Sequence, residues 1–462
     1  MEFATGQDRR WWGYLDAFDG LMGDKRTRTT FREAVRGIIN AGSLVCQQIA
    51  SHSPVLSAAK ESGQRVSRFA RGESTKRSQI DAPALTGVLR ERGIAHLTAR
   101  EGHELWLIAD ASDLRKPHAR EMPDLMEVRD LDGKSVRGYR TMNVVGLTPG
   151  RRAVLYHRLF SSHEETFLSE SKEVQTALQT VSHHLALLKK QREVTWILDS
   201  GFDDVAVWRT VWEQEEHMVC RVKHPERCIE YKNDKGCWVE GDIAAAREEM
   251  TLVAEARAEL LVRRGRQRKA KRQQVPVEIR SVPIRVTYDT AVRREGEGEL
   301  VRKQLWLVEV HLVKTHLKRW LLVTDWPVTN PARALRVFQM YRQRWSVEDS
   351  FGFIKDVLGW EEVQLLDLRG IRTMLALGWV AAGFLYELGV TLQWEELRLL
   401  ARLGGWAERK DNKPGKTVLT RGLRRLLDML ATQAFLDRYR AEHGALPPHI
   451  EALSASLSAD DL

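Results

Sequence analysis

Cysteine is scarce in this chain of 462 residues, and its pattern excludes several classes of protein. The four cysteines are Cys46, Cys220, Cys228 and Cys237. They form no CxxC pair and no spacing typical of a secreted disulfide domain, and no signal peptide is recognisable, so we expect a reducing, cytoplasmic setting. Three of them lie near His217 and His224, but the spacing matches no known zinc finger, which argues against a zinc site.

Long hydrophobic runs are almost absent. One stretch, from 373 to 390, is nearly continuous in apolar residues, yet it is at or below the lower limit for a membrane span and is flanked by charged, helical sequence. We therefore predict a buried helix and no membrane partner. The chain also shows no internal repeat and no clean helix-turn-helix motif, so no sequence specificity toward DNA can be inferred.

Positive charge is in excess. The net charge is +9 and the pI is about 9.4, which suits an anionic partner, although many RNA-binding or membrane-surface proteins are equally basic. The N-terminal hundred residues are basic and helical in pattern, with a helix expected over 31–50 and five cations between Gly63 and Arg77. A further basic run at 263–272 is either a solvated loop or a phosphate-contacting one.

Two aspartates follow apolar runs of strand length. Asp110 ends the run in LWLIADASD, and Asp199 ends the run in VTWILDSGFDD. The ends of such strands are where sites form in open α/β sheets, although either aspartate alone is more often a turn or cap residue. Asp113 competes with Asp110 for this role. Asp203 and Asp204 compete with Asp199, but they are placed to begin the next helix, where acids are favoured.

The segment YRQRWSVEDSFGFIK supplies a third acid. Its notable residues are Tyr341, Arg344, Glu348 and Lys355, at intervals of three, four and seven. These intervals predict one face of a helix, and an ordinary ladder of ion pairs would give the same pattern. Alternatively, Ser346 and Asp349 could form a capping box that starts a new helix near Trp345, leaving only Glu348 and Lys355 on one continuous helix.

The order of expected elements predicts an α/β fold with a ribonuclease-H-like core. Strands are expected at 104–110, 140–147, 153–160, 194–199 and 217–222, helices at 168–190 and 203–214, and a polar connection at 130–138. In that fold the first and fourth strands are neighbours. Asp110 and Asp199 would therefore meet, and a later helix would bring Glu348 to them.

The interval between Asp199 and Glu348 is longer than such a core needs. Strand patterns at 275–290 and 305–313, with a short helix at 241–249, predict an inserted β-domain. The tail from 391 is helical in pattern, with a loop at 410–416. The expected domains are 1–95 (helical), 96–222 with 318–370 (catalytic core), 223–317 (β-rich insert) and 371–462 (helical, a possible dimer contact).

These motifs together resemble a known family. The spacing Y-x2-R-x3-E-x6-K, with Asp110 and Asp199 upstream, is similar to the signature of bacterial DDE transposases of the insertion-sequence-four type. The resemblance runs from about 105 to 355. Three short stretches are similar to the kanamycin-transposon branch of that class, which transposes by cut and paste: DGKSVRG at 132–138, RVKHP at 221–225 and RWLLVTDWPV at 319–328.

The resemblance implies a role for each site residue. Asp110, Asp199 and Glu348 would hold two Mg²⁺ ions, for which Mn²⁺ could substitute, because hard divalent ions prefer carboxylate oxygens. The residues expected to bind phosphate or DNA near them are Tyr341, Arg344, Lys355, Arg221 and Lys223. Trp320 would stack on a base flipped out during hairpin formation, with Trp326 as its local competitor.

The resemblance also implies an activity and partners. A DNA transposase would excise a mobile element by metal-dependent cleavage, through a hairpin intermediate, and join its 3′ ends to target DNA. Its partners would be double-stranded DNA, both terminal inverted repeats and target, bound by a dimer that assembles on DNA in the bacterial cytoplasm. Two other classes stay open: a ribonuclease-H-like, structure-specific nuclease, and a non-catalytic DNA-binding protein derived from a transposase.

Overall fold

The computed structural model describes most of the chain. The described residues are 13–53, 61–73, 80–100, 102–130, 132–187, 192–262, 271–289, 300–313, 315, 317–407 and 414–452. The chain divides into two compact units, which we call the helical unit (1–85 with 353–462) and the sheet unit (86–352). Most of the basic run at 263–272, part of the loop at 410–416, and Lys76 and Arg77 lie outside the described residues.

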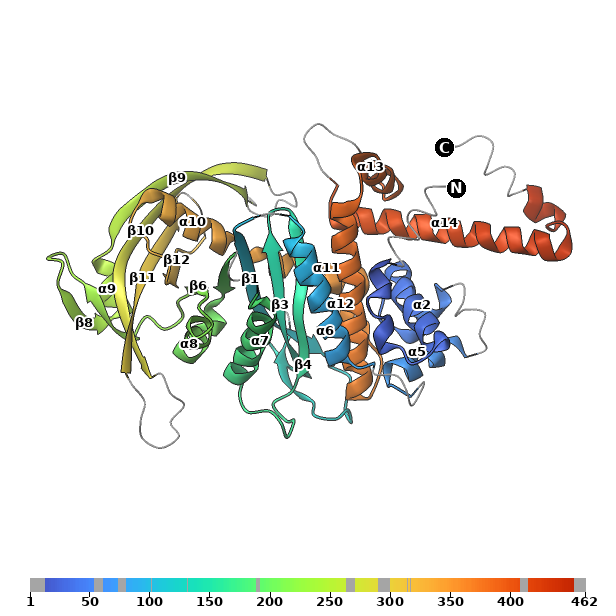
Figure 1. The fold of residues 1–462 in the computed structure, drawn as a ribbon, viewed down its shortest axis with the longest axis horizontal. Helices are drawn as coiled ribbons and strands as arrows, with labels where there is room; N and C mark the ends of the chain where they lie inside the picture. The colour runs from blue at the N-terminus through green and yellow to red at the C-terminus, as the bar shows by residue number, and fades with distance from the viewer. Residues whose placement is uncertain are drawn as a thin grey trace. The chain divides into compact units, whose positions relative to one another are not determined.

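The described part of the helical unit contains α-helices and short 3-10 helices (Figure 1). They are η1 (Asp19–Leu21), α2 (Lys25–Ala41), α3 (Cys46–Ser51), α5 (Ser62–Ala70), η3 (Trp360–Glu362), α12 (Leu368–Thr391), α13 (Trp394–Leu403) and α14 (Lys416–His443). The helical pattern over 31–50 forms two helices, because Gly42 ends α2 before α3 begins. Its φ of +64° is a left-handed conformation that glycine adopts without strain, and its N–H bonds the Ile38 carbonyl.

The apolar stretch forms α12, and the prediction of a buried helix is confirmed. Among the described residues, α12 is the one helix long and apolar enough to cross a membrane, but 78% of its apolar window is buried inside the protein. Trp379 on α12 packs edge-on against Trp360, with ring centroids 6.3 Å apart. The helix therefore serves as the core of its unit.

The sheet unit is built on one large mixed sheet. Its strands are β1 (Glu104–Arg115), β2 (Met126–Arg129), β3 (Ser135–Thr148), β4 (Arg151–Phe160), β5 (Glu193–Leu198), β6 (His217–Arg221), β7 (Cys228–Lys232), β8 (Trp238–Asp242), β9 (Thr251–Val262), β10 (Lys271–Asp289), β11 (Leu300–Leu312) and β12 (Trp320–Thr324). The order is β2-β3-β1-β5-β6-β12-β11-β10-β7-β8, with β4 beside β3 and β9 beside β10. This α/β architecture is consistent with the predicted ribonuclease-H-like fold.

The strand register sets the level of two predicted site residues. Parallel pairing of β1 with β5 ends at Ala109 opposite Leu198, so the next residues, Asp110 and Asp199, lie at the same level of the sheet. The predicted end of the first strand at Asp110 is wrong. β1 continues to Arg115 because β3 still pairs with it there, after β5 has ended.

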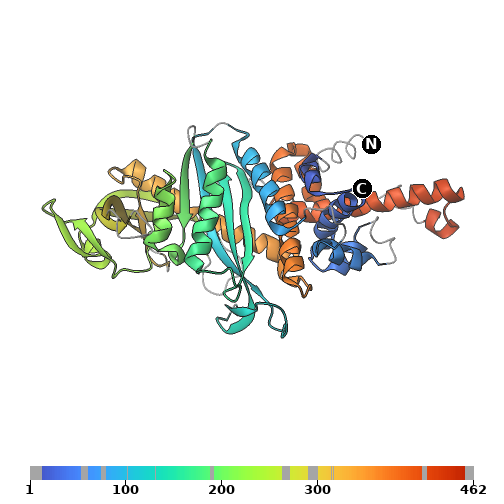
Figure 2. The same cartoon turned by 60° about the horizontal axis from the view of Figure 1, so that its bottom comes forward.

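The predicted polar connection at 130–138 is shorter than expected, since β3 begins at Ser135. Figure 2 shows the paired ends of β1, β2 and β3 continuing beyond the rest of the sheet. Within this extension, a Cβ at Gly138 would lie 2.3 Å from the Leu114 carbonyl oxygen. The glycine that closes the DGKSVRG motif is therefore required by close strand pairing.

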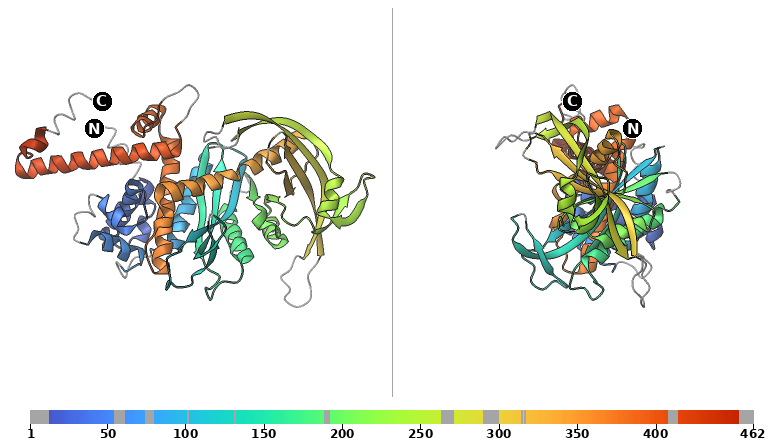
Figure 3. Two further views of the ribbon diagram at one scale, coloured as in Figure 1. Left: turned by 180° about the vertical axis from the view of Figure 1, so that it is seen from behind. Right: turned by 90° about the vertical axis from the view of Figure 1, so that its left-hand side faces the viewer.

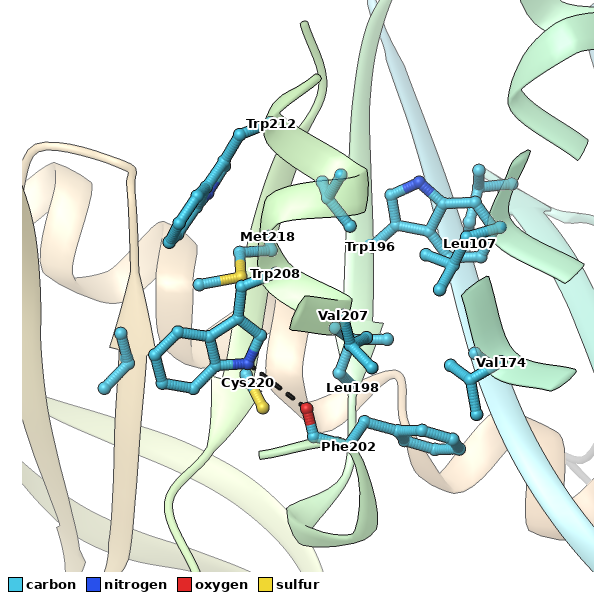
Figure 4. Close-up of a cluster of buried hydrophobic side chains, with 14 of the residues drawn as sticks. Leu107, Val174, Trp196, Leu198, Phe202, Val207, Trp208, Trp212, Met218 and Cys220 are labelled. Carbon is cyan, nitrogen blue, oxygen red and sulfur yellow. Dashed lines mark hydrogen bonds between the residues drawn. The ribbon is translucent and has the colours of Figure 1, made fainter. Parts of the chain in front are cut away.

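Helices cover both faces of the sheet. They are α6 (Ala82–Thr98), α7 (Glu170–Leu185), η2 (Ser200–Phe202), α8 (Val205–Trp212), α9 (Ile243–Glu248), α10 (Pro331–Arg342) and α11 (Trp345–Leu358), the last of which continues into the helical unit. Residues of α6, α7 and α8 share one hydrophobic core with β1 and β5, in which Trp208 donates its indole N–H to the Phe202 carbonyl at 3.2 Å (Figure 4). Seen from behind, α10 and α11 run across the opposite face (Figure 3, left).

The predicted insert does not form a separate sheet. β12 pairs with β6 on one side and with β11 on the other, so the strands of 223–317 extend the core sheet. The described strands and helices of this unit therefore form one compact body. The domain boundaries at 95, 222, 317 and 370 stay predictions.

Candidate active site

Asp110 and Asp199 are brought together by strand alternation and register. Leu105, Leu107 and Ala109 of β1 face the core under α7, so Asp110 points to the opposite face, which α10 and α11 cover. Asp199 follows β5 directly and accepts the Ser200 N–H at 2.7 Å. Both carboxylates are partly exposed.

The helix expected to carry the third acid is broken. α10 ends at Arg342 and α11 begins at Trp345, so the prediction of one helical face for four residues is wrong and the predicted break near Trp345 is present. The capping box proposed as its cause is wrong, because Ser346 lies inside α11 and donates its hydroxyl to Oε1 of Gln343 at 3.4 Å, while Asp349 pairs with Arg152. The Ser346 N–H bonds the Gln343 carbonyl at 2.8 Å across the turn. Tyr341 therefore lies in the last turn of α10, Arg344 in the turn itself, and Glu348 in the first turn of α11.

Arg344 joins two of the three acids. Its Nη1 lies 3.3 Å from Oδ2 of Asp199, and its Nη2 donates to Oε1 of Glu348 at 2.6 Å. The Tyr341 hydroxyl donates to Oδ1 of Asp199 at 3.4 Å. The Arg344 side chain is 9% exposed, so its charge is largely withdrawn from water. The interpretation of the motif as a ladder of ion pairs is thus partly correct, since Arg344 pairs with Glu348. Arg344 also pairs with Asp199, which lies outside the motif, directly after β5.

The third acid, Asp110, belongs to the same electrostatic cluster. Burial raises its pKa to about 7, Asp199 and Glu348 raise it too, and Arg344 partly offsets these effects. Burial alone would lower the pKa of Arg344, but Asp199 and Glu348 hold it above its usual value. Burial and the Asp199 charge raise the pKa of Tyr341, which keeps the phenol protonated as a donor. Three carboxylates therefore share one cation.

The donor types fit a hard divalent ion, because all three acids offer carboxylate oxygens. In the part of the chain that the structure describes, however, no three His, Cys, Asp or Glu side chains lie close enough together to hold a metal ion. Arg344 lies between Asp199 and Glu348 and supplies the positive charge. The three acids thus have the oxygen ligands that Mg²⁺ prefers, and in this structure Arg344 bonds two of them.

The competing aspartates have structural partners. Asp113 pairs with Arg140 at 3.4 Å. Asp203 accepts the backbone N–H of Lys223 at 2.6 Å and holds the loop after β6, and Asp204 caps α8. Each of these carboxylates fastens a loop or a helix end, which supports Asp110 and Asp199 as the better candidates.

The other predicted residues differ in their positions. Trp320 packs edge-on against Tyr341, with ring centroids 5.3 Å apart, whereas its competitor Trp326 lies tilted against His217, with ring centroids 3.9 Å apart. The charge of Arg221 acts on Tyr341, where it partly offsets the rise in the phenol pKa. The Lys223 side chain is exposed. Lys355 belongs to the helical unit, where its ammonium pairs with Glu361 at 3.0 Å.

A buried polar row beside Asp110 was missed from the sequence. Asn143 on β3 is the cross-strand partner of Asp110. Its Oδ1 lies 2.8 Å from Nδ1 of His157, and its amide donates to Thr141 at 3.0 Å. Burial lowers the pKa of His157 to about 3, so the ring is neutral. The available signal was a pair of polar residues inside apolar strands, in RTMNVVGL and VLYHRLF.

The sequence also matches a known family of proteins. The family model described as a transposase DDE domain matches residues 104–382, a range that contains all three acids. No curated protein matches. Among solved structures, the chain is similar to a piggyBac transposase in a synaptic complex with hairpin DNA, at 9% identity and a TM-score of 0.38, covering 78% of this chain and 59% of that one. With more than half of its length matched by the family model, the chain belongs to the transposase DDE domain family.

Proposed function

We propose that this protein is a DNA transposase that excises a mobile element by Mg²⁺-dependent strand cleavage and joins its 3′ ends to target DNA. The supporting observation is the convergence of Asp199 and Glu348 on Arg344, with Asp110 in the same charge cluster. These residues come from three distant segments, and all lie within the matched domain. A carboxyl whose pKa is raised by burial and by two neighbouring acids is the kind of group that active sites contain, which supports the same proposal.

The three acids would hold the divalent ions, two per site, with Mn²⁺ able to replace Mg²⁺. When bound, such ions activate a water or a 3′-hydroxyl and stabilise the leaving oxygen of an in-line displacement at phosphorus. Asp110 would bind as a carboxylate, so its proton must leave first. Because its pKa is about 7, that loss is accessible near neutral pH.

Tyr341 and Arg344 would hold the phosphate next to the scissile bond. The planar guanidinium fork of Arg344 matches two phosphate oxygens, and the protonated phenol of Tyr341 adds a third donor. Both groups now bond Asp199, so both already point at the acid cluster. Arg221, Lys223 and Lys355 are proposed to neutralise more distant phosphates.

The hairpin step is a narrower proposal. Trp320 contacts the Tyr341 ring and is half-buried, so a flipped base could stack on it beside the phosphate-binding group. We expect Trp320→Ala to slow hairpin formation by about tenfold and to leave the first nick unchanged, because one base stack is worth about 1 to 3 kcal/mol. Trp326→Ala is the matched control. Equal loss of both steps in Trp320→Ala would reject the assignment.

The proposed transposase would also have specific binding partners and a cellular location. They are double-stranded DNA, both terminal inverted repeats and target, a dimer assembled on DNA, and the bacterial cytoplasm. The basic N-terminal helices would grip the element ends, and the C-terminal helices would supply the dimer contact. The assignment to the insertion-sequence-four type, near the kanamycin-transposon branch, rests on the motif at 341–355 and the three short stretches around the site.

A cleavage and joining assay tests the function. The substrate is a duplex that carries the DNA found immediately outside the gene on either side, incubated with protein, Mg²⁺ and a target plasmid. Cleavage followed by joining supports a transposase. Cleavage without joining favours a nuclease, and binding without cleavage favours a non-catalytic DNA-binding protein.

A further inference from the structure

Arg344 occupies an unusual position for a phosphate-binding residue. Its guanidinium bonds Asp199 and Glu348, two of the three acids proposed to hold metal, and its side chain is almost fully buried among them. Tyr341 donates to the second oxygen of Asp199. Asp199 thus has both carboxylate oxygens engaged by groups that the proposed function assigns to DNA.

We propose that Arg344 is an exchangeable internal cation, which couples metal binding to DNA binding at this site. Without DNA it balances the acids and competes with the metal. A DNA phosphate draws it out, which frees carboxylate oxygens for the ion. The inference rests on the proposed function, because it takes the three acids as the metal ligands.

Charge and geometry support this exchange. A divalent ion entering beside a buried guanidinium meets strong like-charge repulsion, because little water screens the pair. A phosphate offers the guanidinium a replacement anion of matching shape. Arg344 lies in the turn between α10 and α11, so its side chain can turn away without breaking a helix.

The coupling has a thermodynamic consequence. If a DNA phosphate tightens metal binding by releasing Arg344, metal tightens DNA binding by the same factor. A site of this kind would bind metal weakly until DNA is in place. Cleavage chemistry would then be confined to the DNA-bound protein.

The test measures Mn²⁺ affinity of the DNA-free, full-length protein by titration calorimetry and by the paramagnetic resonance signal of free Mn²⁺. We compare wild type with Arg344→Gln. The matched control is Arg342→Gln, which removes the same charge two residues earlier from a side chain that donates to the Glu259 carbonyl at 2.9 Å. We expect Arg344→Gln to tighten Mn²⁺ binding by about tenfold, within the usual range of coupling, and Arg342→Gln to change it by less than about twofold.

A second titration adds a short DNA duplex of arbitrary sequence. DNA should tighten Mn²⁺ binding in wild type, and this gain should shrink in Arg344→Gln because the competing cation is already gone. Unchanged or weaker Mn²⁺ binding in DNA-free Arg344→Gln overturns the inference. So does an equal DNA effect in both proteins.

Two further variants separate the possible failures. If Asp199→Asn leaves wild-type Mn²⁺ affinity unchanged, the acids are not the ligands, and the proposed function fails with the inference. If Asp199→Asn abolishes binding but Arg344→Gln does not tighten it, the inference alone fails. Should Arg344→Gln not fold, Arg344→Lys replaces it. Lysine keeps the charge without the two-pronged bridge, so intermediate Mn²⁺ affinity is expected, and wild-type affinity contradicts the proposal.

Discussion

Two arginines, one on α10 and one just after it, each bridge two acids, at opposite ends of β5. Arg336 joins Glu104 and Glu193, where β1 and β5 begin, at 2.8 and 2.6 Å. Arg344 joins Asp199, where β5 ends, to Glu348. The Arg336 side chain is 31% exposed and that of Arg344 is 9% exposed. Arg344 also acts on a third acid, Asp110, so the more deeply buried arginine is surrounded by more negative charge.

The surroundings of Arg336 indicate a structural role, whereas those of Arg344 indicate a functional site. Around Arg336, Trp326 lies under the guanidinium at 4.1 Å and bonds Thr195 through its indole N–H at 3.2 Å. This packing fixes the first half of α10 to the strand starts. From Arg336 to its end at Arg342, α10 runs a further ~9 Å along the strands, and the turn after it carries Arg344 to the Asp199 end of β5. The same kind of bridge is therefore structural at one end and proposed to be exchangeable at the other.

The largest expected effect concerns the acids themselves. Glu348→Gln should reduce strand cleavage by more than about 100-fold, since losing even an outer-shell partner of a metal ligand typically costs 10- to 100-fold. Asp349→Asn, at the adjacent residue, which pairs with Arg152, should retain activity. Gel analysis of cleaved duplex measures both. Full activity in Glu348→Gln would contradict the assignment of the site.

The two arginines should differ in how metal affects stability. Without metal, Arg344→Gln should lower the melting temperature by about 5 °C, because it removes a nearly buried cation and leaves three neighbouring acids uncompensated, and Mn²⁺ should restore it. Arg336→Gln should lower it by about 2 °C, because its partners are partly exposed, and Mn²⁺ should have no effect. Differential scanning fluorimetry with and without Mn²⁺ makes the comparison. An identical response of both variants to Mn²⁺ would remove the distinction.

A smaller effect should appear with pH. The pKa of Asp110 is raised from 3.8 to about 7 on folding, so the folded state binds its proton more tightly than the unfolded state does. This contribution to metal-free stability is complete below pH about 4 and is lost as pH rises to about 7. Asp110→Asn should flatten that part of the profile, whereas Asp113→Asn should not. Urea unfolding at several pH values measures the slope, and an unchanged slope in Asp110→Asn would contradict the assigned pKa.

The sequence predicted the two strands that lead to Asp110 and Asp199 better than their surroundings. Apolar runs before Asp110 and Asp199 revealed two strands, and parallel order made them neighbours. The extension of β1 to Arg115 could not be predicted, because its polar residues are strand only through pairing with β3. The union of insert and core depends on β12 pairing with β6 across a hundred residues, as at Leu322 opposite Arg221. Local patterns carry no signal for such distant pairing.

The contact between Arg344 and Asp199 also lay beyond sequence reasoning. The spacing of Arg344 and Glu348 predicts their ion pair, which the structure contains. The second contact arises because the turn at Gln343 re-aims the guanidinium toward the end of β5. A helix unbroken through this point would have kept all four residues of the motif on one face.

The most direct test is a crystal structure of the full chain soaked in Mn²⁺, with and without bound DNA, in which the anomalous signal locates the metal. The account predicts a peak contacted by oxygens of Asp110, Asp199 and Glu348 at about 2.0 to 2.3 Å when DNA is present, with Arg344 turned to a phosphate. A peak elsewhere, or Arg344 still bridging Asp199 and Glu348 beside bound DNA and metal, would contradict it.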